Sequence, residues 1–180
     1  MPYLPLPGEK TAAELVDEVI RVDHAGEYGA QRIYAGQLAV LKNHACAPTI
    51  RHMADQETVH LARFDALMQQ RGARPTALMP LWHVLGYAMG AGTALLGERA
   101  AMACTVAVER VIAEHYAEQD AALPVEEGEL KGTIRQFRDE ELEHHAIGLE
   151  HGAEQAPSYD ALSAVIAGAT RAAIWLSKRF

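Results

Sequence analysis

The sequence predicts an all-α fold: a four-helix bundle built from two copies of one helical hairpin, with an apolar helix linking the copies and another helix at the C-terminus. Apolar residues recur every three or four positions over long segments, and no segment shows the alternation of a β-strand. A residue pattern from the first third of the chain also recurs in its second half. With 180 residues, 49% of them hydrophobic, the chain can bury one core, so residues 1–180 are expected to form a single domain.

The helices can be placed in order from their end signals. Thr11 and Glu14 have the spacing of a capping box, which marks the start of the first helix. Pro48 suits the first turn of the second helix, and Pro157 suits that of the last. The expected helices cover about residues 12–43, 48–72, 81–97, 98–122 and 129–151, followed by one that begins at Pro157.

Charge and cysteine content exclude several classes of protein. The net charge is −8, and no basic stripe of the kind that binds nucleic acid is present, so nucleic acid is not an expected partner. Cys46 and Cys104 are too few for a disulfide framework or a thiolate-rich structural metal site. Residues 1–10 have neither the pattern of a secretion signal nor that of a transit peptide, which favours a bacterial source.

Acidic and histidine side chains crowd together near residue 140. On a helix, residues three or four apart share a face, so Glu141 with His144, Glu140 with His144, or Glu141 with His145 could each bind one metal ion. The stretch alone does not choose among these pairs. An earlier segment offers a single Glu57-x-x-His60. If the two are copies, Glu141 and His144 are the pair, and Glu140, Glu143 and His145 are expected to face outward or to support the ligands.

The upstream residues show that the two segments are copies. Ala25-x-Glu27 followed by Tyr34-Ala35-x-Gln37 matches Ala107-x-Glu109 followed by Tyr116-Ala117-x-Gln119, with the same spacing. Residues equidistant from a hairpin turn lie at one height along an antiparallel pair of helices. Both pairs of glutamates, 27 with 57 and 109 with 141, are centred on an expected turn, so two such hairpins would bring their acids to one depth in the bundle.

Glutamates and histidines at one depth in a bundle form the pattern of a di-iron or di-manganese carboxylate site. A single glutamate is usually a solvated helix residue, but a matched set indicates metal, because unpaired buried carboxylates would repel one another. Oxygen and imidazole ligands without thiolate suit iron or manganese. Glu57 and Glu141 are the expected bridging ligands, and the full expected set is Glu27, Glu57, His60, Glu109, Glu141 and His144.

Three further residues are candidates for supporting roles. Tyr34 and Tyr116 each follow a ligand glutamate by seven residues and share its helix face, so they either donate hydrogen bonds to the ligands or pack in the core. His115, beside Tyr116, is a candidate to line a substrate pocket.

The most apolar stretch, residues 78–97, has no charged side chain. Its length approaches that of a transmembrane helix, but Pro80, His83 and four glycines argue against spanning. Spanning is therefore the least favoured of three interpretations, a buried core helix comes next, and lying against a membrane surface or lipid is the favoured one.

Longer blocks of the sequence resemble a known family. These blocks are Val22–Ala30, Arg32–Gln37, Met79–Trp82, Gly90–Gly97, Ala103–Glu109 and Phe137–His145, and they resemble the demethoxyubiquinone hydroxylase family, often called Coq7. The resemblance extends from about residue 13 onward, and all six expected ligand positions are filled.

The resemblance implies a ferritin-like di-iron monooxygenase that uses O2 to hydroxylate the ring of a polyprenylated demethoxyquinol in ubiquinone biosynthesis. Two iron ions per chain are implied, with NADH or the quinol itself as reductant. The implied location is the cytoplasmic face of a bacterial membrane or the matrix face of the mitochondrial inner membrane, with a homo-oligomer and a lipid-presenting protein as further partners. In residues 78–97, the expected contacts with membrane or tail are Leu81, Trp82, Leu85 and Met89.

Two other functions fit parts of the pattern. A ferritin-like iron-storage or peroxide-scavenging protein would use the same ligands without a membrane. A quinone-binding helical module would carry the carboxylates merely as solvated side chains. Metal content and lipid dependence distinguish these alternatives.

Overall fold

The computed structural model describes residues 10–180, so the first nine residues of the segment searched for targeting signals lie outside the described part. Within residues 10–180 there are α-helices and one short 3-10 helix, η1 (Ala153–Gln155), and no strand, which confirms the all-α prediction. The α-helices are α1 (Ala12–Leu41), α2 (Ala47–Arg71), α3 (Met79–Leu95), α4 (Glu98–Ala122), α5 (Gly128–Glu150) and α6 (Tyr159–Ser177).

Local signals explain where the helices begin and end. The Thr11 hydroxyl accepts a hydrogen bond from the Glu14 amide at 3.2 Å, and the Glu14 carboxylate accepts one from the Thr11 amide at 2.8 Å, so the expected capping box is formed. Gly72 ends α2 with a φ of 70°, a conformation that glycine adopts without strain. The last helix begins at Tyr159 rather than at Pro157.

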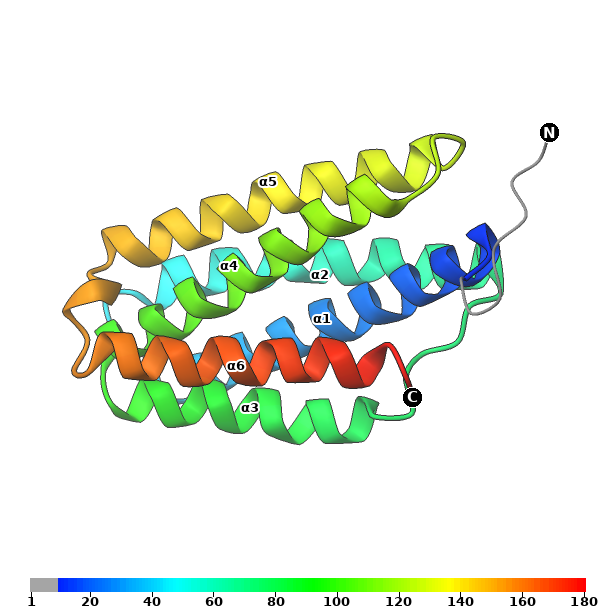
Figure 1. The fold of residues 1–180 in the computed structure, drawn as a ribbon. Coiled ribbons are helices and arrows are strands. Elements are labelled where there is room, and N and C mark those ends of the chain that lie inside the picture. The colour runs from blue at the N-terminus through cyan, green and yellow to red at the C-terminus, as the bar shows by residue number, and fades with distance from the viewer. Residues whose placement is uncertain (1–9) are drawn as a thin grey trace.

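Two antiparallel hairpins, α1–α2 and α4–α5, form the four-helix bundle (Figure 1). Helices α3 and α6 lie side by side as an added layer, with α3 packed along α1 and α6 packed along α4 (Figure 1). The duplicated halves therefore pair in the way that the sequence pattern predicts, and the apolar linking helix lies outside the bundle.

Helix α3 approaches α1 closely because glycines occupy the contact. A methyl group added to Gly36 would lie 2.3 Å from the Tyr87 carbonyl oxygen, and one added to Gly90 would lie 1.9 Å from the Ile33 carbonyl oxygen. These distances are far below van der Waals contact, so no larger residue fits there without separating the helices. Gly36 and Gly90 therefore mark the close contact between α1 and α3.

The apolar core is divided into two main parts. One cluster includes Leu41, Ile50, Met102 and Val106, and it fills the end of the bundle near the α1–α2 connection. The other fills the opposite end and includes Val16, Ile20, Phe64, Leu67 and Ile134. On each bundle helix, the expected metal ligands fall between the residues that supply these two clusters, so the polar centre lies between apolar layers.

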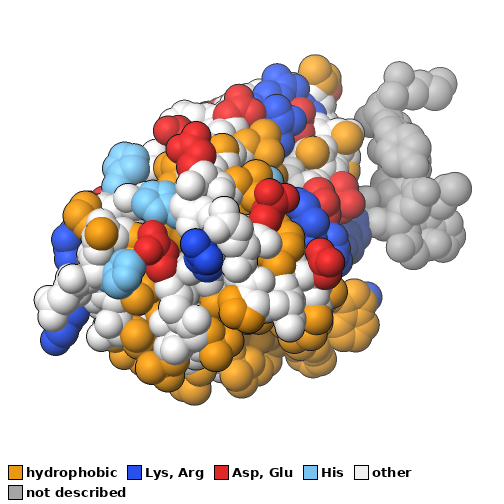
Figure 2. All heavy atoms as spheres, turned by 90° about the vertical axis from the view of Figure 1, so that its left-hand side faces the viewer, with side chains coloured by type: hydrophobic (Ala, Val, Ile, Leu, Met, Phe, Trp, Pro, Cys, Tyr) orange, Lys and Arg blue, Asp and Glu red, His pale blue; other side chains and the backbone are white. Residues whose placement is uncertain are grey.

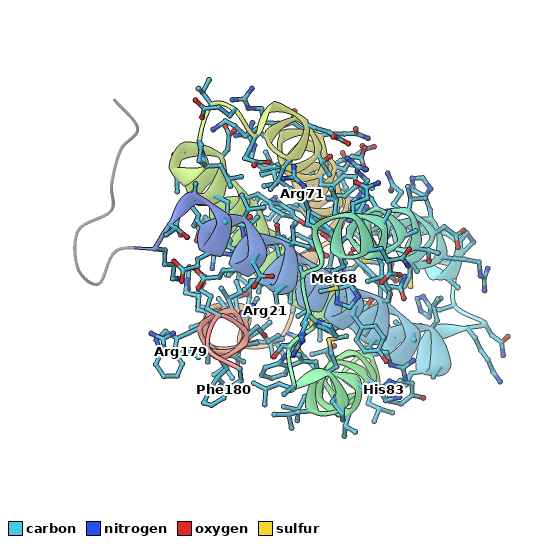
Figure 3. All side chains as sticks on the ribbon, turned by 90° about the vertical axis from the view of Figure 1, so that its right-hand side faces the viewer. Arg21, Met68, Arg71, His83, Arg179 and Phe180 are labelled. Carbon is cyan, nitrogen blue, oxygen red and sulfur yellow. The ribbon has the colours of Figure 1, made fainter. Side chains whose placement is uncertain are left out.

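At the end of the bundle where α6 ends, the α2–α3 connection is joined to the C-terminal residues. The Phe180 carbonyl oxygen accepts hydrogen bonds from the Thr76 hydroxyl at 2.6 Å and the Ala77 amide at 3.0 Å. The Arg179 guanidinium lies 3.7 Å from the centre of the Trp175 ring. Figure 3 views this end and labels Arg179 and Phe180 beside the last turn of α6. The two hydrogen bonds to Phe180 tie the α2–α3 connection to the C-terminal end of α6.

Among residues 10–180, none of the helices combines the length and the apolar character needed to cross a membrane.

The α1–α3 contact yields a paired stability prediction. Gly90→Ala should lower the free energy of unfolding by about 1–3 kcal/mol, because the new methyl group overlaps the Ile33 backbone. Gly92 lies two residues along the same helix, is exposed and has open space around it, so Gly92→Ala should raise the free energy of unfolding by up to about 1 kcal/mol. Denaturant unfolding of both variants tests the contact, and equal effects would contradict it.

Candidate metal centre

The structure brings the six predicted ligands together inside the bundle. Helices α1 and α4 each supply one glutamate, whereas α2 and α5 each supply a glutamate and a histidine three residues later. All six are buried, with at most 3% of any of them exposed: Glu27, Glu57, His60, Glu109, Glu141 and His144. The helices therefore place the six residues at one depth of the bundle, as the sequence predicted.

The donor atoms form two overlapping groups. Glu27, Glu57, His60 and Glu141 offer ligand atoms that all lie within 4.8 Å of one another. The same is true of a second group in which Glu109 and His144 replace Glu27 and His60. Glu57 and Glu141 belong to both groups, and this is the arrangement that two bridging carboxylates require.

Each histidine points its Nδ1 atom into the centre. His60 Nδ1 lies 3.1 Å from a Glu141 oxygen and 3.4 Å from a Glu27 oxygen. His144 Nδ1 lies 3.1 Å from the other Glu141 oxygen and 3.2 Å from a Glu57 oxygen. The two oxygens of Glu141 thus face different histidines, as expected of a carboxylate between two ions.

Several donor atoms in the centre are buried without a hydrogen-bond partner. These atoms are both carboxylate oxygens of Glu57, one oxygen of Glu141 and Nδ1 of His60. They lie within ion-pair distance of one another or of the His144 ring, and all of them belong to residues of the two donor groups. Unsatisfied buried carboxylates are costly, and divalent cations would satisfy all of them at once. The donor set therefore fits a pair of metal ions.

The pKa values of the buried carboxyl groups also indicate a cation site. Burial raises the pKa of Glu57 well above its usual value, and the neighbouring Glu141 and Glu27 carboxylates raise it further. Burial also raises the pKa of Glu109, with repulsion from Glu141 and Glu57. Cations bound between these groups would remove the repulsion and favour the ionised carboxylates that metals need.

The outer nitrogen of each histidine binds a residue from the other hairpin. His60 Nε2 lies 2.5 Å from a Glu140 oxygen, and His144 Nε2 lies 2.9 Å from the side-chain oxygen of Gln56. A proton on Nε2 satisfies both contacts and leaves Nδ1 free to bind metal. Sequence reasoning did not assign Gln56 a role, although its place directly before Glu57, like that of Glu140 before Glu141, was a signal.

The remaining acidic and histidine residues of the crowded stretch lie away from the centre. Glu143 is exposed and His145 is half-buried. Glu140 reaches only the outer side of His60. These placements agree with the expectation that the three would face outward or support the ligands.

The two tyrosines also connect the hairpins. Tyr34 on α1 donates a hydrogen bond to Glu109 on α4 at 2.6 Å, and Tyr116 on α4 donates one to Glu27 on α1. Burial and the adjacent carboxylates raise the pKa of both phenols, which keeps them protonated as donors. Of the two alternatives raised by the sequence, the tyrosines thus occur as donors to the predicted ligands, and both are also fully buried.

Comparisons with known proteins identify the family. A family model described as ubiquinone biosynthesis protein COQ7 matches residues 14–177. The chain belongs to the COQ7 family.

Individual COQ7-family relatives cover most of the chain. A Rattus norvegicus protein named NADPH-dependent 3-demethoxyubiquinone 3-hydroxylase, mitochondrial, is 59% identical over 92% of this chain and 78% of its own length. A Rhodospirillum rubrum protein named 3-demethoxyubiquinol 3-hydroxylase is 56% identical over 97% of this chain and 82% of its own. A Saccharomyces cerevisiae protein named 5-demethoxyubiquinone hydroxylase, mitochondrial, is 44% identical over 93% and 79% respectively. The family resemblance seen in the sequence is thereby confirmed.

In this COQ7-family chain, an apolar cavity of about 130 Å³ lies between the bundle and the added layer. Helices α1, α3, α4 and α6 supply its walls, and the α1 residues include Gly26, next to Glu27. Of the four residues expected to contact membrane or tail, Trp82, Leu85 and Met89 line this cavity. Leu81 is 44% exposed instead, and Trp82 is turned inward, where its indole nitrogen donates a hydrogen bond to Ser177 at 3.0 Å.

His115 lies apart from the six ligands. It lines two pockets of about 200 Å³ each beside Lys178, and its Nε2 lies 3.0 Å from the Gln119 amide nitrogen. Gln119 also donates a hydrogen bond to the buried Asp23 at 2.7 Å. The Gln119 amide nitrogen can only donate, so His115 Nε2 must accept a hydrogen bond from it and carry no proton. Burial also lowers the pKa of His115, to about 4.

The neutral state of His115 predicts a specific pH dependence. The folded protein holds this imidazole at a pKa of about 4, whereas the unfolded chain protonates it near pH 6.5. The folded state therefore binds fewer protons, so the free energy of unfolding should fall as the pH drops from about 6.5 to about 4, by up to about 3 kcal/mol from this residue. His115→Gln should remove that component, as measured by denaturant unfolding across this range.

The exposed His52 on α2 provides a matched control for this prediction. His52→Gln should retain the pH dependence of the parent protein. If His115→Gln and the parent lose stability in parallel, His115 is not the buried neutral group.

Proposed function

We propose that the chain is a hydroxylase of ubiquinone biosynthesis that uses two iron ions and O2 to hydroxylate the ring of a polyprenylated demethoxyquinol. The observation that carries the proposal is the pair of overlapping buried donor groups sharing Glu57 and Glu141. The names of the relatives suggest the reaction and the substrate class.

The chain's own residues would divide between two ions. Glu27 and His60 would hold one ion, and Glu109 and His144 would hold the other. The shared residues Glu57 and Glu141 would bind both ions. Bound iron supplies the redox chemistry that activates O2. The protein excludes water with its two apolar clusters, fixes the imidazoles through Gln56 and Glu140, and holds the outer carboxylates through Tyr34 and Tyr116.

The apolar cavity and the added layer support the quinone part of the proposal. The cavity walls include residues of α1 and α4, which also carry Glu27 and Glu109, so a ring or tail bound there would lie near the proposed ions. Trp82, Leu85 and Met89 would contact the tail. A quinol reaches such a site most directly from the bilayer in which it dissolves.

The outer face of α3 and α6 is the proposed membrane-facing surface. Figure 2 shows hydrophobic side chains gathered along the lower edge of the molecule, where α3 lies. The large exposed apolar residues on α3, at its C-cap and on α6 are Leu81, Val84, Leu85, Tyr87, Leu95, Leu96, Val165 and Trp175. Such a face suits peripheral attachment to a bilayer at the bacterial cytoplasmic face or the mitochondrial matrix face. A second copy of the chain or a lipid-presenting protein would meet the same surface.

The names of the relatives and the reducing power of the quinol support a proposal for the electron donor. Mitochondrial relatives are named as NADPH-dependent. For this chain we propose a reduced nicotinamide, NADH or NADPH, or the quinol itself. The sequence has no G-x-G-x-x-G nucleotide fingerprint on a strand and helix, so a nicotinamide would bind without that motif.

Incubation of iron-reconstituted protein with a demethoxyquinol, reductant and isotopically labelled O2 tests the reaction directly. We expect one labelled oxygen atom in the product ring by mass spectrometry. Iron uptake and oxidation without ring labelling would favour the ferritin-like storage or peroxide-scavenging alternative. Far fewer than about two irons per chain would favour the non-enzymatic alternative.

Ligand assignment predicts opposite outcomes for two nearby glutamates. Glu141→Ala should abolish hydroxylation and lower iron content by about half or more, because a shared carboxylate is lost. Glu143→Ala removes an exposed carboxylate two residues away and should largely preserve both. Iron analysis alongside product formation measures the two effects, and equal losses would contradict the assignment.

The proposed membrane-facing surface predicts a loss of lipid binding without loss of metal. Val84 is 62% exposed on α3, so Val84→Asp should weaken binding to anionic liposomes about tenfold or more while iron content stays unchanged. Val125 is 82% exposed in the α4–α5 turn, away from this surface, and Val125→Asp is the matched control. Flotation assays of both variants should differ clearly, and identical behaviour would argue against α3 as the contact.

A further inference from the structure

Another group of side chains that could bind a metal ion lies at the end of the bundle remote from the C-terminus. His44 and Cys46 stand in the connection between α1 and α2, and Glu98 is the first residue of α4. His151 directly follows α5. Figure 2 views this end and shows histidine side chains beside acidic ones. None of these residues belongs to the six ligands of the central site.

Three of these side chains converge on one point. His44 Nδ1 lies 3.4 Å from Cys46 Sγ and 3.3 Å from a Glu98 oxygen. All three donor atoms lie within 4.8 Å of one another. One ring nitrogen thus faces a thiol and a carboxylate together. It can accept the thiol proton or donate to the carboxylate, but it cannot do both.

A bound cation satisfies all three groups. In tetrahedral zinc sites the bonds to nitrogen and oxygen are about 2.0–2.1 Å and the bond to sulfur about 2.3 Å, which places neighbouring N and O ligands about 3.3 Å apart and N and S ligands about 3.5 Å apart. The separations from His44 Nδ1 to Glu98 and to Cys46 match these values. We propose that His44, Cys46 and Glu98 form a second metal site, for a borderline divalent transition ion of the Zn²⁺ class.

The surroundings support this assignment. The other oxygen of Glu98 lies 3.0 Å from His151 Nδ1, a contact that orients the carboxylate from outside the site. Cys46 is 1% exposed, whereas the His44 side chain is 47% exposed, so an ion would enter past His44 and keep water at its fourth position. Cys46 is also the N-cap of α2 and makes no side-chain capping bond, so its sulfur faces His44 instead and lies near the positive end of a helix dipole.

The Cys46 thiol would lose its proton when the metal binds, and not before. Burial and the Glu98 carboxylate raise the pKa of Cys46 in the metal-free protein. A divalent ion replaces this proton, so binding at neutral pH should release about one proton per ion. The bound ion would tie the α1–α2 connection to the start of α4 and, through His151, to the end of α5.

Cobalt(II) is the probe that separates this site from the central one. The six central ligands include no sulfur, so a sulfur-to-cobalt charge-transfer band in the near ultraviolet reports only a thiolate site. Protein whose central site is loaded with iron should be titrated with Co²⁺. We expect one such band, saturating at about one ion per chain, and displacement of the cobalt by Zn²⁺. The same titration of metal-free protein should give the same band, because the six central ligands contain no sulfur and cobalt bound there adds no thiolate signal.

Variants assign the band to this cluster. Cys46→Ser should abolish it, and the exposed His44→Ala should weaken Co²⁺ binding at least about tenfold. Cys104 is the other cysteine and is buried in the core, so Cys104→Ala should retain the band, as should His52→Ala, which removes an exposed histidine of α2. Glu98→Gln keeps the shape of its side chain and should weaken binding at least about tenfold even if Cys46→Ser fails to fold.

The opposite results would overturn the proposal. Absence of a thiolate band in the folded parent protein would show that the three groups merely share hydrogen bonds. A band that persists in Cys46→Ser, or binding that is unchanged in both His44→Ala and Glu98→Gln, would place the metal elsewhere.

Discussion

The burial of four carboxylates and two imidazoles at one depth of the bundle is the constraint on which the rest of the structure depends. Without counter-ions this arrangement is unfavourable, because each carboxylate loses water and faces like charges. It persists between two apolar clusters that fix all four helices on both sides. The helices are therefore aligned by ordinary core packing, and the charged layer is a consequence of that alignment. Metal binding would convert the least favourable layer into a cross-link.

Most supports of the centre cross from one hairpin to the other. Tyr34 of the first hairpin holds Glu109 of the second, and Tyr116 of the second holds Glu27 of the first. Each imidazole is also supported from the other hairpin, since Gln56 contacts His144 and Glu140 contacts His60. Neither hairpin contains a complete site, so the centre exists only when both are docked.

The crossed supports also make the two proposed ion positions inequivalent. His60 faces a carboxylate on its outer nitrogen, whereas His144 faces an amide. A carboxylate partner makes an imidazole a stronger electron donor than an amide partner does. The duplicated scaffold thus presents two similar ligand sets with different electronic character, while α3 and α6 enclose an apolar cavity beside only one face of the bundle.

Local and periodic features were determined by the sequence alone. Helix positions followed from apolar spacing and from end signals such as the Thr11 capping box. The repeat identified the glutamates and histidines that meet in the bundle. It could do so because two residues of a helical hairpin lie at the same height when they are equally far from the turn. Tertiary structure decided the rest. Which side chain supports which ligand, the inward turn of Trp82 and the meeting of His44 and Cys46 with Glu98 all depend on contacts between residues far apart in the chain. No sequence period encodes such contacts, since the relative rotation of packed helices selects them.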